Sequence, residues 1–248
     1  NYLNSAQIKE AVAYWDNALD KHTSKNTQNA INTALGNSLK NFISEGIRYT
    51  QNDAFAEDTF KSYYGDLDLF GDRAKTIFEE GIDTLVSAYK QGDSSVTYEK
   101  LNLALERLSI FNSISSKIEN SKQTLELYRE ARQKYDEGLK KLDNKEYLDG
   151  LALLSEVSNQ TELYSKAQEK INEILPTART AIIEEAKSEA NNNKSSKAKK
   201  LITELMLYFP NDQELVELSE SFGEDRTDWI WTKTVDHLFT HCLVAYPE

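Results

Sequence analysis

Apolar residues recur at steps of three and four positions from residue 8 to residue 222. This is the period of an α-helix that buries one face. The first two stripes predict two helices, and they consist of Ile8, Val12, Trp15 and Leu19, then Ile31, Leu35, Leu39, Phe42 and Ile43. His22 is expected in the last turn of the first helix, where the helix dipole favours it.

A segment rich in aromatic residues follows, and Gly65 and Gly71 interrupt it. Because glycine favours turns, the segment predicts one or two short helices around turns. Its apolar residues are Phe55, Phe60, Tyr63, Tyr64, Leu67 and Phe70. A regular stripe returns over residues 74–89, and Gly92 is typical of a residue that ends such a helix.

Two longer stripes predict two further helices of about two dozen residues each. The first consists of Leu101, Leu105, Leu108, Phe111, Ile114 and Ile118, and the second of Tyr128, Ala131, Tyr135, Leu139 and Leu142. Shorter units with frequent start and stop signals come next.

Three start signals stand out in the second half of the chain. Asp143 is spaced to cap a helix with Glu146 as its capping-box partner, and Asn211 and Glu214 have the same spacing. Pro176 is expected in the first turn of a helix, because its missing N–H would have no intrahelical acceptor there.

These patterns predict an all-α fold. Antiparallel helices with short connections form helical repeats (a solenoid) or an elongated helical bundle, because no single helix can bury its stripe alone. We expect an N-terminal helical region over 1–120, helical hairpins over 121–225, and a linker with the start of a further domain over 226–248.

Residues 179–212 are similar to a tetratricopeptide repeat, a 34-residue helix pair with small residues where its helices cross. Ala186, Ala198 and Pro210 follow one another at intervals of twelve, and Ile202 occupies the second-helix apolar position. The resemblance implies a concave face that binds a peptide or another protein.

A second copy can be placed over 131–164, with Gly138, Tyr147, Gly150 and Leu154 in corresponding positions. The copies start at residues 131 and 179, which are 48 residues apart, so an extra helix lies between them. Both copies lack the large aromatic residue near the start, and residues 1–120 contain no copy. The tetratricopeptide-like region is therefore about 131–222.

The charge balance narrows the class of partner. A net charge of -12, from 41 acidic and 29 basic residues, is spread through the chain. This excludes the basic surface that nucleic acids require, and it disfavours an anionic membrane surface. No apolar run is long enough for a transmembrane helix.

No catalytic or cofactor-binding residue is assigned, and no cofactor is expected. Paired carboxylates could suggest acid–base chemistry, but on exposed helix faces we expect them to be solvated. These pairs are Asp66 and Asp68, Glu79 and Glu80, and Glu184 and Glu185. The sequence contains no phosphate-binding or nucleophile-elbow motif.

The last twenty residues differ in kind, since β-branched and aromatic residues there predict a short strand. His237 and His241 are the one pair with a metal-like spacing, but in a strand they would lie roughly 13 Å apart. We therefore assign no metal ligand, and Cys242 is expected to be a small buried apolar residue.

Residues 235–248 resemble the opening strand of the catalytic domain of exported polysaccharide-deacetylase-like proteins. The family's metal-ligand pair has the spacing of His237 and His241, but Leu238 and Cys242 replace the polar residue and the proline of its motif. The upstream Asp-Asp motif is also missing, so the ligand roles are not transferred. The resemblance implies a hydrolase of acetyl groups on cell-surface glycans, whose catalytic domain would lie beyond Glu248.

Three functions are expected from these observations. The first is a non-catalytic interaction or scaffold module of an exported, cell-surface protein that binds a protein or a cell-wall glycan. The second is an accessory region of such a deacetylase-like enzyme, and the third is a structural spacer or a self-associating arm that forms a homo-oligomer. The expected localisation is extracellular or at the cell surface, with the cytoplasm as the alternative.

Overall fold

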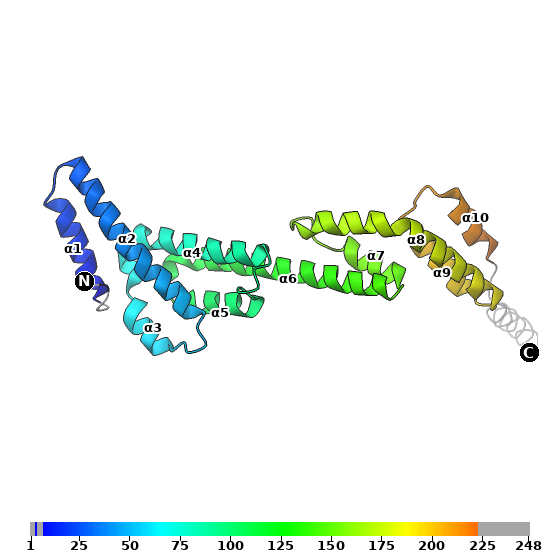
Figure 1. Ribbon diagram of the computed structural model, residues 1–248, viewed down its shortest axis with the longest axis horizontal. Coiled ribbons are helices and arrows are strands. Elements are labelled where there is room, and N and C mark those ends of the chain that lie inside the picture. The colour runs from blue at the N-terminus through cyan, green and yellow to red at the C-terminus, as the bar shows by residue number, and fades with distance from the viewer. Residues whose placement is uncertain (1–2, 4–6, 223–248) are drawn as a thin grey trace, which may run out of the picture. The chain divides into compact units, whose positions relative to one another are not determined.

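The computed structural model describes residue 3 and residues 7–222, in which helices are joined by turns and loops (Figure 1). It contains ten α-helices and no strand, so the predicted all-α fold class is confirmed. The strand expected after residue 226 lies outside the described residues.

The chain divides into two compact units, residues 1–130 and 131–248. The boundary lies inside one helix, ten residues after the predicted boundary between residues 120 and 121. The predicted third region, 226–248, is outside the described part. Each unit is described by itself below.

Unit 1 is organised around its second helix, which contacts four other helices of the unit. The elements of unit 1 are α1 (Ile8–Asp20), α2 (Lys25–Thr50), α3 (Glu57–Tyr64), the 3-10 helix η2 (Leu67–Phe70), α4 (Asp72–Lys90), α5 (Tyr98–Leu108), the 3-10 helix η3 (Asn112–Ile114) and the first part of α6 (Ser115–Asp143). Helix α2 packs against α1, α3, α4 and α5. The two short helices expected in the aromatic segment are α3 and η2.

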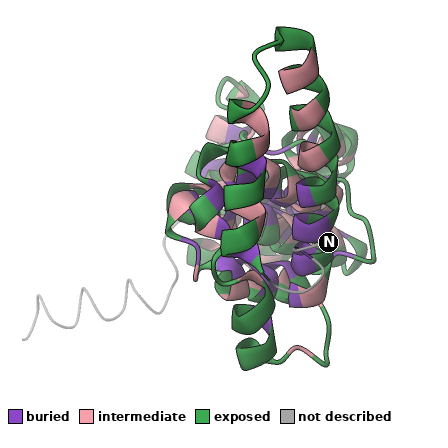
Figure 2. Ribbon diagram, turned by 90° about the vertical axis from the view of Figure 1, so that its left-hand side faces the viewer, coloured by how far each residue is buried: buried purple, intermediate pink, exposed green. Residues whose placement is uncertain are grey.

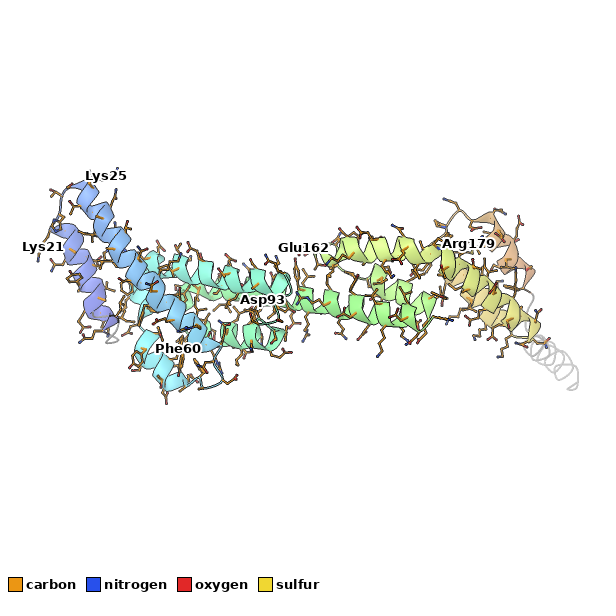
Figure 3. The ribbon with its side chains drawn as sticks, viewed as in Figure 1. Lys21, Lys25, Phe60, Asp93, Glu162 and Arg179 are labelled. Carbon is orange, nitrogen blue, oxygen red and sulfur yellow. The ribbon has the colours of Figure 1, made fainter. Side chains whose placement is uncertain are left out.

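Aromatic rings fill the centre of unit 1. Phe60 of α3, labelled in Figure 3, is 1% exposed. Its ring lies near those of Tyr49, Phe55, Tyr64 and Phe111, with centroid distances between 5.1 and 6.3 Å. Such clusters bury a large apolar area and add favourable edge and offset contacts. The aromatic segment therefore closes the core against α2 and α5.

The stripe over residues 101–118 is divided among α5, η3 and the start of α6 and does not form the single helix predicted. Helix α5 ends at Leu108, and α6 begins only at Ser115. Between them Phe111 is extended and fully buried, and the Asp68 carboxylate accepts hydrogen bonds from the backbone N–H of Asn112 and from the Ser113 hydroxyl. The prediction was wrong because this external acceptor satisfies a break in the helix while the apolar residues keep facing one core.

Unit 2 contains the rest of α6, α7 (Tyr147–Ser155), α8 (Leu163–Asn191), α9 (Ser195–Leu205) and α10 (Gln213–Ser221). Helix α8 packs against α7 and α9, and α9 against α10. In both units the buried residues form stripes on helices whose other faces are exposed (Figure 2). This is the distribution that the three- and four-residue spacing predicts.

Small residues lie where helices of unit 2 cross. A Cβ atom added to Gly150 would lie 2.7 Å from Cδ2 of Leu142 and 3.0 Å from the carbonyl oxygen of Gly138. Helices α6 and α7 can therefore approach this closely only with glycine at these positions. Ala186 of α8 and Ala198 of α9 are fully buried, as expected for small residues at a second crossing.

The expected capping role of Asp143 was wrong, because Asp143 is the last residue of α6. The chain then turns at Lys145, which has a φ of 63°, and the N–H groups of Lys145 and Glu146 bond to the carbonyls of Leu142 and Lys141 at 2.9 Å. This is a Schellman motif. It leaves Glu146 as the residue before α7, with no side-chain cap.

The same C-terminal motif confirms the predicted helix end at Gly92. Gly92 has a φ of 79°, and its N–H bonds to the carbonyl of Tyr89, while that of Asp93 bonds to Ala88. His22, in contrast, lies two residues beyond the end of α1 rather than in its last turn.

Pro176 lies inside α8 rather than at the start of a helix. Both halves of α8 bury residues of one core, such as Ile171 before the proline and Ile182 after it, so packing outweighs the lost backbone hydrogen bond. In Figure 1 the helix changes direction along its length, and Figure 3 labels Arg179 at this bend, three residues after Pro176. Proline is a usual cause of such a kink.

The sequence predicted Asn211 as the cap of α10, but the cap is Asp212. The Asp212 carboxylate accepts hydrogen bonds from the N–H groups of Glu214 and Leu215 at 3.1 and 3.3 Å. The Glu214 side chain bonds elsewhere, so the predicted reciprocal capping box does not form.

Candidate functional site

An apolar hollow of about 280 Å³ lies between α1, α2 and η2 in unit 1. We call it the apolar hollow, and it is lined by Leu3, Ala11, Tyr14, Trp15, Leu35, Ser38 and Phe70. Its volume is just below the range of small-molecule pockets, which starts at about 300 Å³. It therefore suits one large side chain better than a whole cofactor.

The aromatic wall of the hollow is held in place from several sides. Trp15 and Phe70 are each 5% exposed, and their rings meet edge to face at 6.0 Å. The indole N–H of Trp15 donates a 2.9 Å hydrogen bond to Oδ1 of Asn32, and the Arg73 guanidinium lies 4.7 Å from the centre of the Trp15 ring. A group entering the hollow thus meets a preformed surface.

The apolar hollow exists because two of the side chains that line it are small. Ala11 projects from α1 and Ser38 from α2, where a longer side chain at either position would occupy the hollow. The Ser38 hydroxyl donates to the carbonyl of Ala34 at 3.2 Å, so its oxygen is still able to accept a hydrogen bond. Tyr14, which is 56% exposed, forms the side of the hollow nearest to solvent.

A second hollow, of about 500 Å³, is lined by Glu45, Arg48, Tyr49, Asn52 and Tyr64. We call it the polar hollow. The Tyr49 hydroxyl accepts a hydrogen bond from the backbone N–H of Ala56 at 3.1 Å, which fixes this ring. Burial raises the pKa of Tyr64, and the charge of Glu45 raises it further, while the charge of Arg48 opposes the shift. Tyr64 lines the same hollow as Glu45 and Arg48, and its raised pKa keeps the phenol protonated at neutral pH.

A third hollow of about 290 Å³ lies between α2 and α4, and Arg48 lines both this hollow and the polar hollow. Lys40 and Glu80, which both line the third hollow, form an ion pair of 3.2 Å between the two helices. Because Lys40 and Glu80 neutralise each other in this contact between helices, we do not assign a ligand to the third hollow.

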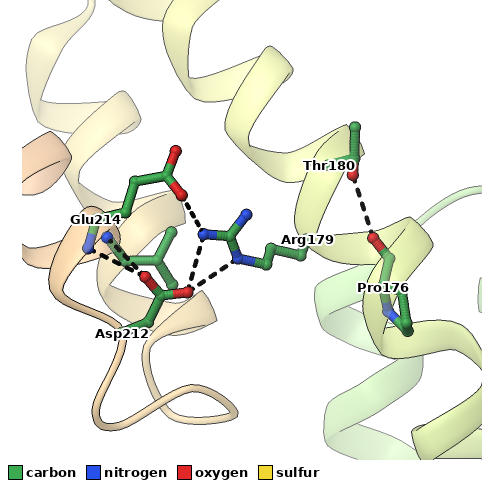
Figure 4. A network of polar contacts seen from close by, with 6 residues as sticks. Pro176, Arg179, Thr180, Asp212 and Glu214 are labelled. Atoms are coloured by element: carbon green, nitrogen blue, oxygen red, sulfur yellow. Dashed lines mark hydrogen bonds and ion pairs between the residues drawn. The ribbon is translucent and has the colours of Figure 1, made fainter.

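Unit 2 contains a polar network that joins α8 to the start of α10 (Figure 4). Arg179 donates to the carboxylate of Asp212 at 2.9 Å and to that of Glu214 at 2.6 Å. Burial works against ionisation of Asp212, but the hydrogen bond from Arg179 and those from Leu215 and Glu214 outweigh it, so its pKa is lowered. The network therefore stabilises the N-terminus of α10.

The carboxylate pairs noted in the sequence are not brought together as acid–base pairs, and most are exposed. Asp66 lies 3.9 Å from Lys9, and Glu185 lies 3.7 Å from Lys197. Asp68 differs from the expectation, because it is half-buried and accepts the two hydrogen bonds that precede α6.

Over residue 3 and residues 7–222, no group of three or more potential ligand residues could hold a metal ion. His237, His241 and Cys242 lie outside the described residues. The deacetylase-like resemblance of 235–248 also concerns that part of the chain, so it stays a prediction.

The apolar and polar hollows were not predicted from the sequence. Ala11, Ser38 and Glu45 are ordinary residues of amphipathic helices, and only the packing of three elements brings the lining of the apolar hollow together. Tyr14 gave the one available signal, since it is a large aromatic residue beside the buried stripe of α1 and not on it.

None of the helices in the described residues is long and apolar enough to cross a membrane. Comparisons with protein-family models, with curated proteins and with solved structures find no significant match to this chain.

Proposed function

We propose that this chain is a non-catalytic helical interaction module whose unit 1 binds a peptide segment of a partner protein. The observation that carries the proposal is the apolar hollow, with its fixed wall of Trp15 and Phe70 and its solvent-facing Tyr14. Buried aromatic pockets of this kind take the anchor residues that dominate binding energy at protein interfaces.

The size and lining of the hollow favour one occupant. A volume of about 280 Å³ with mainly apolar walls suits a single large apolar side chain, such as Phe or Leu, presented by a peptide. The Ser38 oxygen can accept one hydrogen bond from the peptide backbone beside that side chain. A charged group would lose its hydration there without gaining a partner.

Unit 2 supports the tetratricopeptide-like part of the proposal. The contact of Gly138 with Gly150 and the full burial of Ala186 and Ala198 are what such helix pairs need where they cross. In this proposal the module belongs to an exported, cell-surface protein.

The proposal is tested by selecting random peptides on the full chain and comparing two variants of neighbouring residues of α2. Ser38→Leu places a larger apolar side chain in the hollow. Asn37→Leu adds the same side chain at an exposed position that does not line it. Circular dichroism and thermal unfolding check that both variants fold.

We expect the selected peptides to share a large apolar residue. Ser38→Leu should weaken their binding by about tenfold or more, as expected for the loss of a buried anchor, and Asn37→Leu should leave it unchanged. Equal binding by the wild-type chain and Ser38→Leu, or no enrichment of any peptide, would show that the hollow is not a binding site.

A further inference from the structure

The apolar and polar hollows lie along the same flank of α2. Ser38 lines the first, and Glu45 and Asn52 line the second. Ser38 and Glu45 are seven residues apart within α2, which places them on one stripe of this helix, and Asn52 follows two residues after the helix ends at Thr50. A peptide that runs along this flank can reach both hollows.

Arg48 sets the chemistry of the polar hollow. It is exposed, and its side chain makes no hydrogen bond or ion pair in the described part of the chain. Two other cations at this part of α2 are engaged within the fold, since Lys40 pairs with Glu80 and Arg107 donates to the backbone carbonyls of Thr50 and Asn52. Arg48 is therefore the cation of this flank that is left for a ligand.

The neighbours of Arg48 limit what that ligand can be. A guanidinium recognises a carboxylate through paired hydrogen bonds, and the protonated Tyr64 hydroxyl beside it can donate another. Glu45, which lines the same hollow, and the net charge of -12 both oppose a run of acidic residues. The charges thus fit one isolated carboxylate.

We propose that Arg48 binds a carboxylate of the same peptide whose apolar side chain fills the apolar hollow, so that unit 1 recognises an apolar residue and an acidic group at a fixed separation. This inference rests on the proposed function. Ser38 and Arg48 are ten residues apart in α2, or about 15 Å along its axis. An extended peptide advances roughly 3.3 Å per residue, so the two groups are four or five residues apart.

The carboxylate can come from an acidic side chain or from the C-terminus of the partner. Three synthetic peptides separate these sources. The first is acetyl-Phe-Ser-Gly-Ser-Glu-amide, the second has Gln in place of Glu, and the third is acetyl-Phe-Ser-Gly-Ser-Gly with a free C-terminal carboxylate. Their affinities for the full chain are measured by NMR titration.

The protein variants isolate Arg48 from a general change of charge. Arg48→Ala removes the guanidinium, while Lys40→Ala removes one positive charge from the same helix outside the polar hollow. We expect the Glu peptide to bind the wild-type chain about tenfold more tightly than the Gln peptide, as for a charge-assisted contact that is partly exposed. Arg48→Ala should abolish this preference, and Lys40→Ala should keep it.

The free C-terminal peptide decides the source of the carboxylate. If it binds like the Glu peptide, the contact accepts either source; if it binds like the Gln peptide, an acidic side chain is required. No preference in the wild-type chain for either carboxylate over Gln, or a preference that survives Arg48→Ala, overturns the role of Arg48 while leaving peptide binding itself intact. Failure of all three peptides to bind the wild-type chain would instead contradict the proposed function.

Discussion

The indole Nε1 of Trp15 donates a 2.9 Å hydrogen bond to Oδ1 of Asn32, and this bond joins α1 to α2 beside the apolar hollow. Trp15 is 5% exposed, so its N–H would find no ready substitute in water if Asn32 were removed. The bond therefore fixes one wall of the proposed binding site, and it has a measurable consequence for stability.

Asn32→Ala should lower the free energy of unfolding of unit 1 by about 1 kcal/mol relative to Asn29→Ala, because a nearly buried donor loses its partner. Asn29 is exposed on the same helix, so both variants share the same gain in helix propensity. Urea unfolding followed by Trp15 fluorescence, with Trp229→Phe and Trp231→Phe in the background, measures the difference. Equal midpoints for the two variants would mean that the bond contributes nothing.

Phe60→Ala should destabilise unit 1 by about 3–5 kcal/mol, because it leaves a cavity in the centre of the core. Phe60 is 1% exposed, whereas Tyr63 on the same helix is 46% exposed. Tyr63→Ala is the matched control and should change the thermal stability far less. Similar melting temperatures for the two variants would contradict the position of Phe60 in the core.

Gly150→Ala should destabilise unit 2 by about 1–2 kcal/mol, since crowding at the helix crossing outweighs the gain in helix propensity. The added methyl group would meet Leu142 and the carbonyl of Gly138. At Gly36 of α2 it would meet only the Trp15 ring, at an ordinary 3.9 Å, so Gly36→Ala should stabilise unit 1. Calorimetry distinguishes the opposite signs, and stabilisation by Gly150→Ala would rule out the close crossing.

Asp212 should give unit 2 a stability that depends on acid pH. Its pKa is lowered in the folded chain from the ordinary value of 3.8, chiefly because Arg179 and backbone N–H groups outweigh the effect of burial. A group with a lowered folded pKa stabilises the fold above its unfolded pKa, and this stabilisation is lost as the pH falls from there through the folded pKa.

Asp212→Asn isolates the charge, because the amide oxygen still caps α10. Chemical unfolding from about pH 7 to about pH 2.5 should show the wild type more stable than Asp212→Asn at neutral pH, with a gap that closes in acid. Asp212→Ala should be weaker than Asp212→Asn at both ends of the range, because it also lacks the cap. A gap that is constant with pH would exclude a contribution from the charge.

The sequence predicted the all-α class and the helices of unit 1 up to Gly92, because each buries a single stripe with regular spacing. The errors have one cause in common, which is that distant residues decide local structure. Asp68 accepts hydrogen bonds at the break before α6. Buried residues on both sides of Pro176 keep α8 continuous through the proline. The Glu214 side chain bonds to Arg179 and not to its predicted capping partner.

The candidate site could not be predicted for the same reason. The apolar hollow is made by what Ala11 and Ser38 lack, and a missing side chain gives no signal in a hydrophobic pattern. Arg48 looks like any exposed cation until the structure shows that it lines the polar hollow without an ion pair, while Lys40 of the same helix is paired with Glu80.

The NMR signal of the Trp15 indole N–H tests the central claim most directly. In the chain with Trp229→Phe and Trp231→Phe, this signal is the only one of its kind, because the sequence contains three tryptophans. Titration with acetyl-Phe-Ser-Gly-Ser-Glu-amide should shift it saturably, and the same titration of a Ser38→Leu variant should leave it in place. A Trp15 signal that does not move at all, or one that moves equally in the Ser38→Leu variant, would contradict peptide binding in the apolar hollow.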